Sequence, residues 1–369
     1  MHTITVIVPA HNEEEGLPAT LESLAGQTVP PDRVLVVDDA STDRTGEVAA
    51  SHGVTVLRPP RNLGSKAKAQ NFALPHCTTD LVLAVDADTV LAPDYIETVV
   101  PAFDDPAVAI AAGTVRTRHT RTIWERGRST EYLFGFHWHR PIQARANSPM
   151  VCSGCCSVFR RDDLAAFGGF PERTIVEDMD FTWSQQIAGR KAVYVADAVA
   201  LAADPEDLTY LRKQVWRWMA GFCQNVRLHF GGLVRHKPLL AVWVLLALLE
   251  IVTAPLWWAA PFVAAATTDR PLAVTFGWWV GADLLLTAPP LVYAARRREL
   301  PLSGVLVNIP CVYATKAVNL VYAWKALLVE LLLVPLHLAR GLTVYEKGRA
   351  DTPMAAARGG AAALAGAAG

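Results

Sequence analysis

The chain has 369 residues, of which 52% are hydrophobic and 19% are charged. This length suits one large domain with a further region, and the low charged fraction argues against a wholly soluble protein. The net charge of −1 gives no overall attraction to nucleic acid, so we expect no nucleic-acid partner.

Four short, β-branched apolar runs in the first 85 residues predict strands. Segments with helical periodicity separate several of them: Leu17, Leu21 and Leu24 form one apolar stripe, and residues 94–103 form another. The expected strands span residues 3–8, 33–37, 54–57 and 81–85. Strands that alternate with helices predict a mainly parallel sheet in a three-layer α/β domain.

Four carboxylates follow two of the expected strands. Asp38 and Asp39 come after the second strand, and Asp86 and Asp88 come after the fourth. The carboxyl ends of parallel strands meet at one edge of a sheet, where ligands bind. Two carboxylates one residue apart suit Mg²⁺ or Mn²⁺, because these cations prefer oxygen ligands. The alternatives are a polar strand end without metal and, for Asp38 and Asp39, a cap on the helix that opens near Asp43.

Two lysines follow a glycine that comes shortly after the third expected strand. Lys66 and Lys68 stand just after Gly64, where an ammonium group can reach a phosphate. An exposed helix face is an equally good interpretation for Lys68. We therefore assign phosphate binding to Lys66.

The pattern is less regular between residues 113 and 237, which we interpret as the second half of the same domain. A helix is expected from about Asp207, and on it Gln214, Arg217 and Trp218 stand at i, i+3 and i+4, so they share one face. Arginine can hold phosphate oxygens and tryptophan can stack on a sugar ring. The alternative is a helix whose Trp and Arg side chains anchor it at lipid headgroups.

Two stretches after residue 238 are apolar enough to cross a membrane. Leu239–Thr268 has Glu250 as its only charged side chain, and Pro271–Ala295 has only Asp283. Each exceeds the roughly 20 residues that a span needs. A third stretch, Leu302–Leu338, carries several charges and could be one span followed by a helix on the membrane surface.

Charged residues predict the orientation of these spans. Residues 13–15 are acidic and no basic region precedes them, so we expect no signal peptide and a first domain that stays in the cytosol. Arg235 and Lys237 before the first span, and residues 296–298 after the second, place both flanks inside. The tail is nearly all Ala, Gly and Arg, which predicts disorder. The expected regions are residues 1–237 (cytosolic domain), 238–346 (membrane region with two or three transmembrane helices) and 347–369 (disordered tail).

Six short motifs follow one another between residues 3 and 235. They are V-I-V-P-A-H-N-E (residues 6–13), V-V-D-D-A-S (36–41), G-S-K-A-K-A-Q-N (64–71), D-A-D (86–88), V-E-D (176–178) and Q-V-W-R-W (214–218). The ordered set resembles glycosyltransferase family 2. The last motif resembles the Q-x-x-R-W signature of its membrane-bound processive members, the cellulose, chitin, hyaluronan and poly-N-acetylglucosamine synthases.

The resemblance implies a GT-A (Rossmann-like) domain that binds a nucleotide-diphosphate sugar, here a uridine diphosphate sugar carrying N-acetylglucosamine or glucose. An Asp carboxylate suits the N3–H of uracil, and Asp39 is the first choice, with Asp38 beside it. We assign the nucleotide sugar to Pro9, Ala10, Asp38, Asp39, Lys66 and Asp86, and the metal, Mg²⁺ or Mn²⁺, to Asp86 and Asp88.

The resemblance also implies an inverting reaction in which Asp178 deprotonates the acceptor hydroxyl. Arg217 would hold diphosphate oxygens, and Gln214 and Trp218 would bind the acceptor sugar. The expected acceptor is a growing polysaccharide; transfer of one sugar to a lipid, of the ceramide glucosyltransferase or polyprenyl-phosphate type, is the alternative. A non-catalytic membrane transporter or scaffold is a third interpretation.

Location in the cell membrane as a multi-pass protein follows from the expected spans. Membrane lipids are then partners, and a membrane partner subunit is left open. The intramembrane Glu250 and Asp283 are expected either to line a polymer path or to pair with Lys316 or Lys325.

Overall fold

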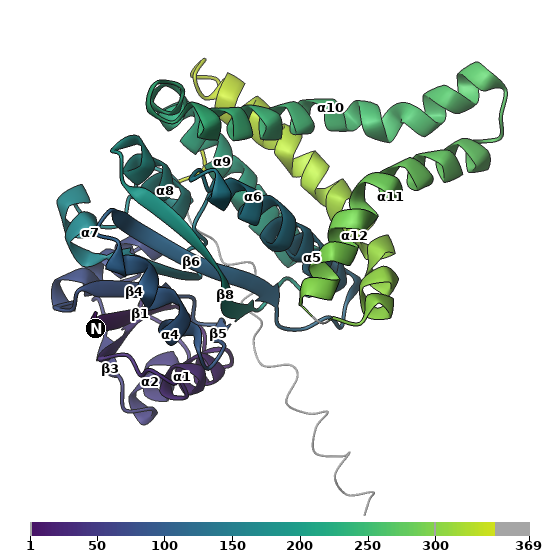
Figure 1. The fold of residues 1–369 in the computed structure, drawn as a ribbon. Helices are drawn as coiled ribbons and strands as arrows, with labels where there is room; N and C mark the ends of the chain where they lie inside the picture. The colour runs from purple at the N-terminus through teal and green to yellow at the C-terminus, as the bar shows by residue number, and fades with distance from the viewer. Residues whose placement is uncertain (1, 299, 344–369) are drawn as a thin grey trace, which may run out of the picture.

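The computed structural model describes residues 2–298 and 300–343. The strands in this part of the chain are β1 (Ile4–Ala10), β2 (Arg33–Asp38), β3 (Thr55–Leu57), β4 (Leu81–Val85), β5 (Val90–Leu91), β6 (Val108–Thr117), β7 (Cys156–Arg160) and β8 (Lys191–Ala202). They form one mixed sheet in the order β3-β2-β1-β4-β7-β6-β8-β5 (Figure 1). Strands β1 to β4 are parallel, whereas β7 is antiparallel to both β4 and β6. The predicted α/β class is confirmed, and the second half of the domain makes the sheet mixed.

Helices cover both faces of the sheet. They are α1 (Leu17–Ala25), α2 (Thr45–Ser51), α3 (Lys66–Ala73), α4 (Tyr95–Val99), α5 (Ile123–Phe134), α6 (Arg140–Arg145), α7 (Arg161–Phe167), α8 (Glu177–Ile187) and α9 (Leu208–His236). One apolar core contains the expected α1 stripe of Leu17, Leu21 and Leu24. A second core, on the other face, contains Leu164 of α7 and Phe181 of α8. The two cores give the three layers that the alternating pattern predicts.

Local chemistry explains where two of these helices begin and end. Thr122 and Glu125 form a capping box at the start of α5, because each side chain binds the backbone N–H of the other. The helical segment expected over residues 94–103 is shorter: α4 ends at Val99, and a 3₁₀ turn follows. Pro101 lies in that turn and has no N–H to continue an α-helix.

Three long apolar helices follow α9. They are α10 (Pro238–Thr268), α11 (Leu272–Arg297) and α12 (Leu302–Ala326), and α12 continues in π-helical form over Leu327–Leu333. In the described part of the chain, three helices are long and apolar enough to cross a membrane, so the third stretch is a full-length candidate. Residues 334–337 after it form turns. The expected tail, 347–369, lies outside the described residues.

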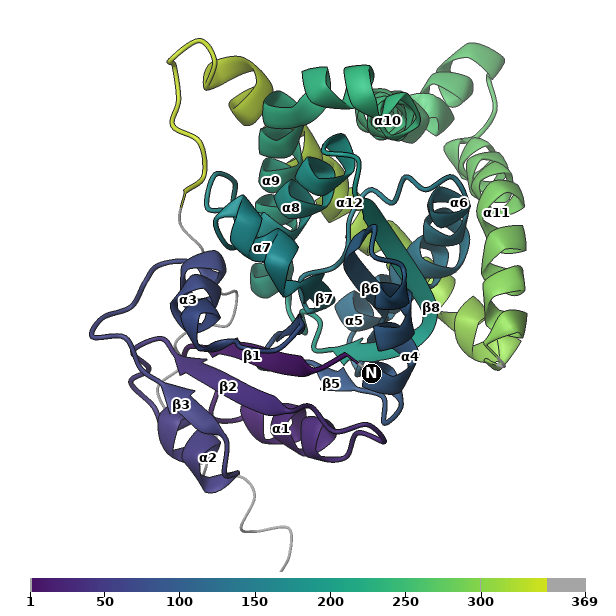
Figure 2. The same ribbon diagram turned by 60° about the vertical axis from the view of Figure 1, so that its left-hand side comes forward.

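The apolar helices stand at one end of the molecule (Figures 1 and 2). Helices α10 and α11 form a hairpin that leans away from β1, β2 and β3, whereas α12 packs against α5 and α9 of the first domain. Large apolar side chains are exposed on the hairpin, among them Leu256, Leu285 and Leu286. Exposed apolar surface of this extent suits contact with lipid tails.

Candidate functional site

A cavity of about 1130 Å³ opens at the carboxyl ends of β1, β2 and β4. At one end the cavity is lined by Pro9, Ala10 and Asp39. The first turn of α8 and one face of α9 line its middle, and α10, α11 and α12 line its other end. Strand ends of this kind are where α/β sheets bind ligands. One continuous space therefore joins the sheet edge to the apolar helices.

The adjacent carboxylates at the end of β2 have different surroundings. Asp38 is fully buried and lies outside the cavity wall: its Oδ2 accepts a hydrogen bond from Arg58 Nη1 at 2.7 Å, and its Oδ1 accepts one from the Ser41 N–H at 3.0 Å. Asp39 lines the cavity and accepts from the Leu63 N–H at 2.8 Å. Burial raises the pKa of Asp39. Asp39 thus faces the cavity, and the hydrogen bonds of Asp38 hold the turn in which it lies.

Lys66 stands at the centre of the polar end of the cavity. Its Nζ lies 2.5 Å from Asp86 Oδ1 and 3.5 Å from Glu177 Oε1, and it donates to the Gly154 carbonyl at 2.9 Å. The side chain of Lys68 is exposed on the other side of α3. This position agrees with the interpretation of Lys68 as part of an exposed helix face. Lys66 therefore contacts three separate segments: Asp86 after β4, Gly154 in the loop before β7, and Glu177 at the start of α8.

Asp86 and Asp88 are the two expected metal ligands, and both line the cavity. In the described residues, no group of three or more His, Cys, Asp and Glu side chains is arranged to hold a metal ion. The donor set nevertheless fits Mg²⁺ or Mn²⁺, because two carboxylates leave positions for diphosphate oxygens and water. These cations bind in this way in nucleotide sites.

Asp178 lies in the first turn of α8, and its carboxylate faces the same cavity. Its Oδ2 accepts from the Gly154 N–H at 2.6 Å and its Oδ1 from the Met179 N–H at 2.7 Å. Burial, together with the negative charge of Glu177, raises the pKa of Asp178 to about 6, although Lys66 acts in the opposite direction. A carboxylate with this pKa is ionised at neutral pH and is a stronger base than an ordinary one.

A glycine makes this arrangement possible. A Cβ on Gly154 would lie 3.1 Å from Asp178 Oδ2 and 3.2 Å from Lys66 Nζ. Such distances are tighter than ordinary van der Waals contacts, so a side chain at this position would push the two charged groups away. The backbone of residue 154 can bond to both groups because it has no side chain.

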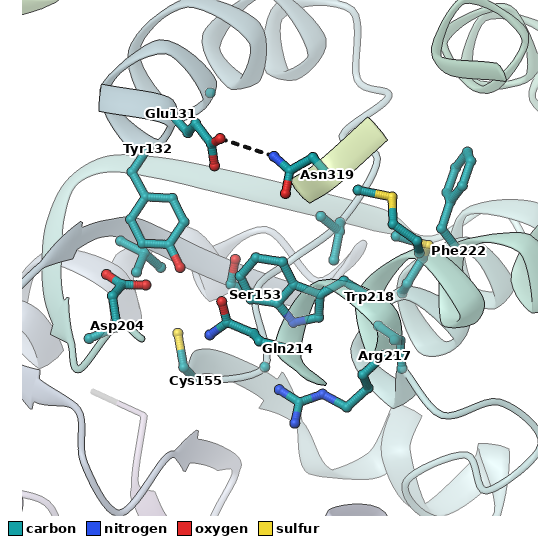
Figure 3. A pocket seen from close by; sticks show the side chains of 18 of the residues that line it. Glu131, Tyr132, Ser153, Cys155, Asp204, Gln214, Arg217, Trp218, Phe222 and Asn319 are labelled. Carbon is teal, nitrogen blue, oxygen red and sulfur yellow. Dashed lines mark hydrogen bonds between the residues drawn. The ribbon is translucent and has the colours of Figure 1, made fainter. Parts of the chain in front are cut away.

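Gln214, Arg217 and Trp218 project from one face of α9 into the cavity (Figure 3). Gln214 Oε1 accepts from Arg128 Nη2 at 3.1 Å, and the Arg128 guanidinium lies 4.8 Å from the centre of the Trp218 ring. Trp216 between them points elsewhere, with the Lys325 ammonium of α12 at 4.1 Å from its ring. The three expected side chains thus share one cavity wall.

Four residues carry no role in the sequence analysis: Arg128, which bonds to Gln214, and Glu131, Tyr132 and Asp204, which line the cavity. Burial raises the pKa of Asp204 to about 6, against the effect of Arg128. Figure 3 shows the Tyr132 hydroxyl directed toward Asp204. The first three stand at i, i+3 and i+4 on α5, the spacing that identified the motif on α9. That spacing was the signal available in the sequence.

The far part of the cavity lies among the apolar helices. Asp283 of α11 accepts from the Tyr313 hydroxyl at 2.9 Å and lies 3.5 Å from Lys316 Nζ. Asp283 therefore pairs with Lys316, as one of the two interpretations expects, and both Asp283 and Glu250 line the cavity. Trp257, Trp258 and Trp279 add a mainly aromatic wall.

This geometry defines a class of protein. A strand-end pocket with acidic side chains and a lysine suits a nucleotide diphosphate, and it opens into a space whose polar and aromatic walls suit sugar rings. The space continues among apolar helices that are long enough to cross a membrane. These features together describe a glycosyltransferase that works at a membrane.

Comparison with known proteins identifies the family. Residues 5–168 match the model for glycosyl transferase family 2. An N-acetylglucosaminyltransferase of Rhizobium sp. (strain N33) is 32% identical over 307 residues, which cover 74% of this chain and 68% of that protein. A hyaluronan synthase of Streptococcus pyogenes is 28% identical over 66% of this chain and 62% of its own length. The chain thus spans about two thirds of these relatives. It belongs to glycosyltransferase family 2, as the motifs predict.

A solved structure has the same fold. The mannosyltransferase of Pyrobaculum calidifontis, determined in complex with GDP-Man and Mn²⁺, superposes with a TM-score of 0.61 at 26% identity. The match covers 80% of this chain and 86% of that one. The expected GT-A-like domain followed by apolar helices is therefore confirmed.

Proposed function

We propose that this protein transfers N-acetylglucosamine from UDP-N-acetylglucosamine to a growing polysaccharide, with inversion at the anomeric carbon and with a divalent metal. The observation that carries the proposal is the continuous cavity from Asp39 past Asp178 to the apolar helices. UDP-glucose is the other donor that fits. Relatives named N-acetylglucosaminyltransferase and hyaluronan synthase support the amino sugar and the polymer product.

The donor occupies the sheet edge in this proposal. Asp39 accepts a hydrogen bond from the base, the backbone of Pro9 and Ala10 lines the base pocket, and Asp38 fixes the turn behind Asp39. Lys66 Nζ lies within 3.5 Å of both Asp86 and Glu177. Its ammonium group is therefore at the place where the diphosphate would bind and can contact it. Asp86 and Asp88 hold Mg²⁺ or Mn²⁺, which would neutralise charge on the departing diphosphate.

The reaction is a single displacement at the anomeric carbon. Asp178 takes the proton of the acceptor hydroxyl as that oxygen bonds to the anomeric carbon. The bond from this carbon to the UDP oxygen breaks, and the electron pair leaves with UDP. Arg217 holds diphosphate oxygens with its forked donors. Attack opposite to the leaving group inverts the configuration.

The acceptor lies across the face of α9. Trp218 stacks on its terminal ring, and Gln214 donates to a hydroxyl, because its Oε1 already accepts from Arg128. Residues 1–237 form the catalytic domain on the cytosolic side, and residues 238–346 form a multi-pass membrane region. Basic residues beside α10 and α11 support this orientation.

A lipid acceptor is the second candidate. The far part of the cavity, with Trp257, Trp258 and Trp279, is mainly apolar and lies among the helices that would contact lipid. A single sugar could therefore be transferred to the head of a membrane lipid whose tail occupies this space.

Nucleotide release tests the proposal. Full-length protein purified in lipid nanodiscs is incubated with UDP-N-acetylglucosamine, UDP-glucose or GDP-mannose, each with and without an N-acetylglucosamine oligosaccharide. We expect fastest release of UDP from UDP-N-acetylglucosamine, and faster release with the oligosaccharide present. Binding of a donor without any release would support the non-catalytic interpretation instead.

A further inference from the structure

A polar cluster joins α5, α9 and α12 behind the acceptor wall. Figure 3 shows one of its hydrogen bonds, between Glu131 and Asn319. Arg128 of α5 has only 4% of its surface exposed, and it donates to Glu131 Oε2 at 2.6 Å and to Gln214 Oε1 at 3.1 Å. Its guanidinium also faces the Trp218 ring at 4.8 Å. One buried side chain thus contacts two of the three acceptor-motif residues of α9.

Glu131 extends the cluster to the third apolar helix. Its Oε1 accepts from Thr315 Oγ1 at 2.5 Å and from Asn319 Nδ2 at 3.0 Å, and both of these residues belong to α12. Its other oxygen holds Arg128. A continuous series of hydrogen bonds therefore runs from α12 through Glu131 and Arg128 to Gln214.

The backbone of α5 fits closely against α12 at the same level. A Cβ on Gly127 would lie 2.5 Å from Thr315 Cγ2 and 2.7 Å from the Cys311 carbonyl oxygen, so only glycine fits without displacement. One turn earlier in α12, Asn308 Oδ1 accepts a hydrogen bond from Arg126 Nε at 2.7 Å. A shift of α12 along α5 would consequently move Glu131 and the side chains bonded to it.

We propose that Arg128 and Glu131 are positioning residues that hold Gln214 and Trp218 in register with α12, so that the third apolar helix sets the geometry of the acceptor site. The inference rests on the proposed function, because it gives Gln214 and Trp218 an acceptor to bind. Arginine is required at position 128, since its planar fork can bond two partners while its face lies over an aromatic ring. Lysine keeps the charge near Glu131 but offers neither the fork nor the flat face.

The test uses one conservative substitution at two neighbouring positions of α5. Arg128→Lys breaks the link to Gln214 and Trp218. Arg126→Lys is the matched control: Arg126 bonds to Asn308 and to the Val307 carbonyl of α12, and a lysine there keeps a charged donor for these oxygens. For each variant in nanodiscs, three quantities are measured: UDP release from UDP-N-acetylglucosamine to water, the KM for an N-acetylglucosamine oligosaccharide, and the melting temperature.

We expect Arg128→Lys to raise the oligosaccharide KM at least tenfold, while UDP release to water stays within threefold of wild type and the melting temperature changes little. Arg126→Lys should leave the oligosaccharide KM unchanged. If Arg128→Lys lowers the melting temperature and both activities together, the cluster has only a structural role and the inference is wrong. A wild-type protein that releases no UDP from any donor would instead remove the proposed function.

A double substitution tests the connection to α12. Thr315→Val keeps the shape of the side chain but removes its hydrogen bond to Glu131. Thr315→Val alone should raise the oligosaccharide KM, and it should add little to the effect of Arg128→Lys, because both changes interrupt the same series of bonds. Effects that add in full would show that α12 does not act through Arg128.

Discussion

Replacement of Asp178 by asparagine separates the chemistry of the proposed base from its structural role. Asparagine has almost the same shape but cannot accept a proton at neutral pH. Transfer should therefore fall by the roughly 10²-fold to 10⁴-fold that a positioned base contributes. Binding of UDP-N-acetylglucosamine should be retained, because Asp39, Lys66 and Asp86, to which the donor is assigned, are unchanged in this variant.

The stability of this variant can be worked out from the same site. Burial raises the pKa of Asp178 from 3.8 to about 6. At about 1.36 kcal/mol per pKa unit, ionisation of this carboxyl at pH 8 costs the folded state about 3 kcal/mol at most. The raised pKa means that this cost is absent below pH 3.8 and grows as the pH rises toward 6.

Asparagine removes that cost but loses one of two backbone hydrogen bonds, worth about 1 kcal/mol. Asp178→Asn should thus melt at the same or a slightly higher temperature than wild type at pH 8. Wild-type transfer should fall as the pH drops through about 6, because the base becomes protonated. The assays are oligosaccharide transfer across pH 5 to 9, donor binding, and thermal melting in nanodiscs.

Glu177→Gln is the control for the neighbouring carboxylate, which pairs with Lys66 at 3.5 Å. It should retain more transfer activity than Asp178→Asn. Near-normal transfer by Asp178→Asn beside an inactive Glu177→Gln would refute the assignment of the base.

Two further predictions concern the metal and the acceptor wall. Chelation should abolish transfer and added Mn²⁺ or Mg²⁺ should restore it, since the cation at Asp86 and Asp88 stabilises the leaving diphosphate; full turnover in chelator would remove these two residues as metal ligands. Trp218→Ala should weaken acceptor use by on the order of 1 kcal/mol, measured as a rise in acceptor KM with donor binding unchanged. Loss of membrane association alone would assign Trp218 to lipid anchoring instead.

Local patterns predicted much of the first domain and of the polar end of the cavity. Apolar runs located β1 to β4, and strand ends then placed Asp39, Asp86 and Asp88 at one edge because the strands are parallel. Helical spacing placed Gln214 and Trp218 on one face. Each of these inferences uses residues within a few positions of one another, where geometry follows directly from secondary structure.

The same patterns did not predict contacts between distant segments of the chain. Asp38 was grouped with Asp39, but its carboxylate bonds to Arg58 and to the Ser41 N–H and does not line the cavity. The importance of Arg128 and Glu131 depends on α12, whose contacting residues lie more than 180 positions away in the chain. Such partners are set by how whole helices pack, which periodicity within one helix does not specify.

Product analysis tests the central claim most directly. Membranes that contain the full-length protein are incubated with radiolabelled UDP-N-acetylglucosamine, UDP-glucose and GDP-mannose, and the label is separated into lipid-extractable and high-molecular-weight fractions. Membranes with the Asp178→Asn variant provide the control. We predict that label from UDP-N-acetylglucosamine enters high-molecular-weight material in the wild-type membranes only. Label confined to the lipid fraction would establish the single-sugar lipid acceptor, and incorporation from no donor would contradict the account as a whole.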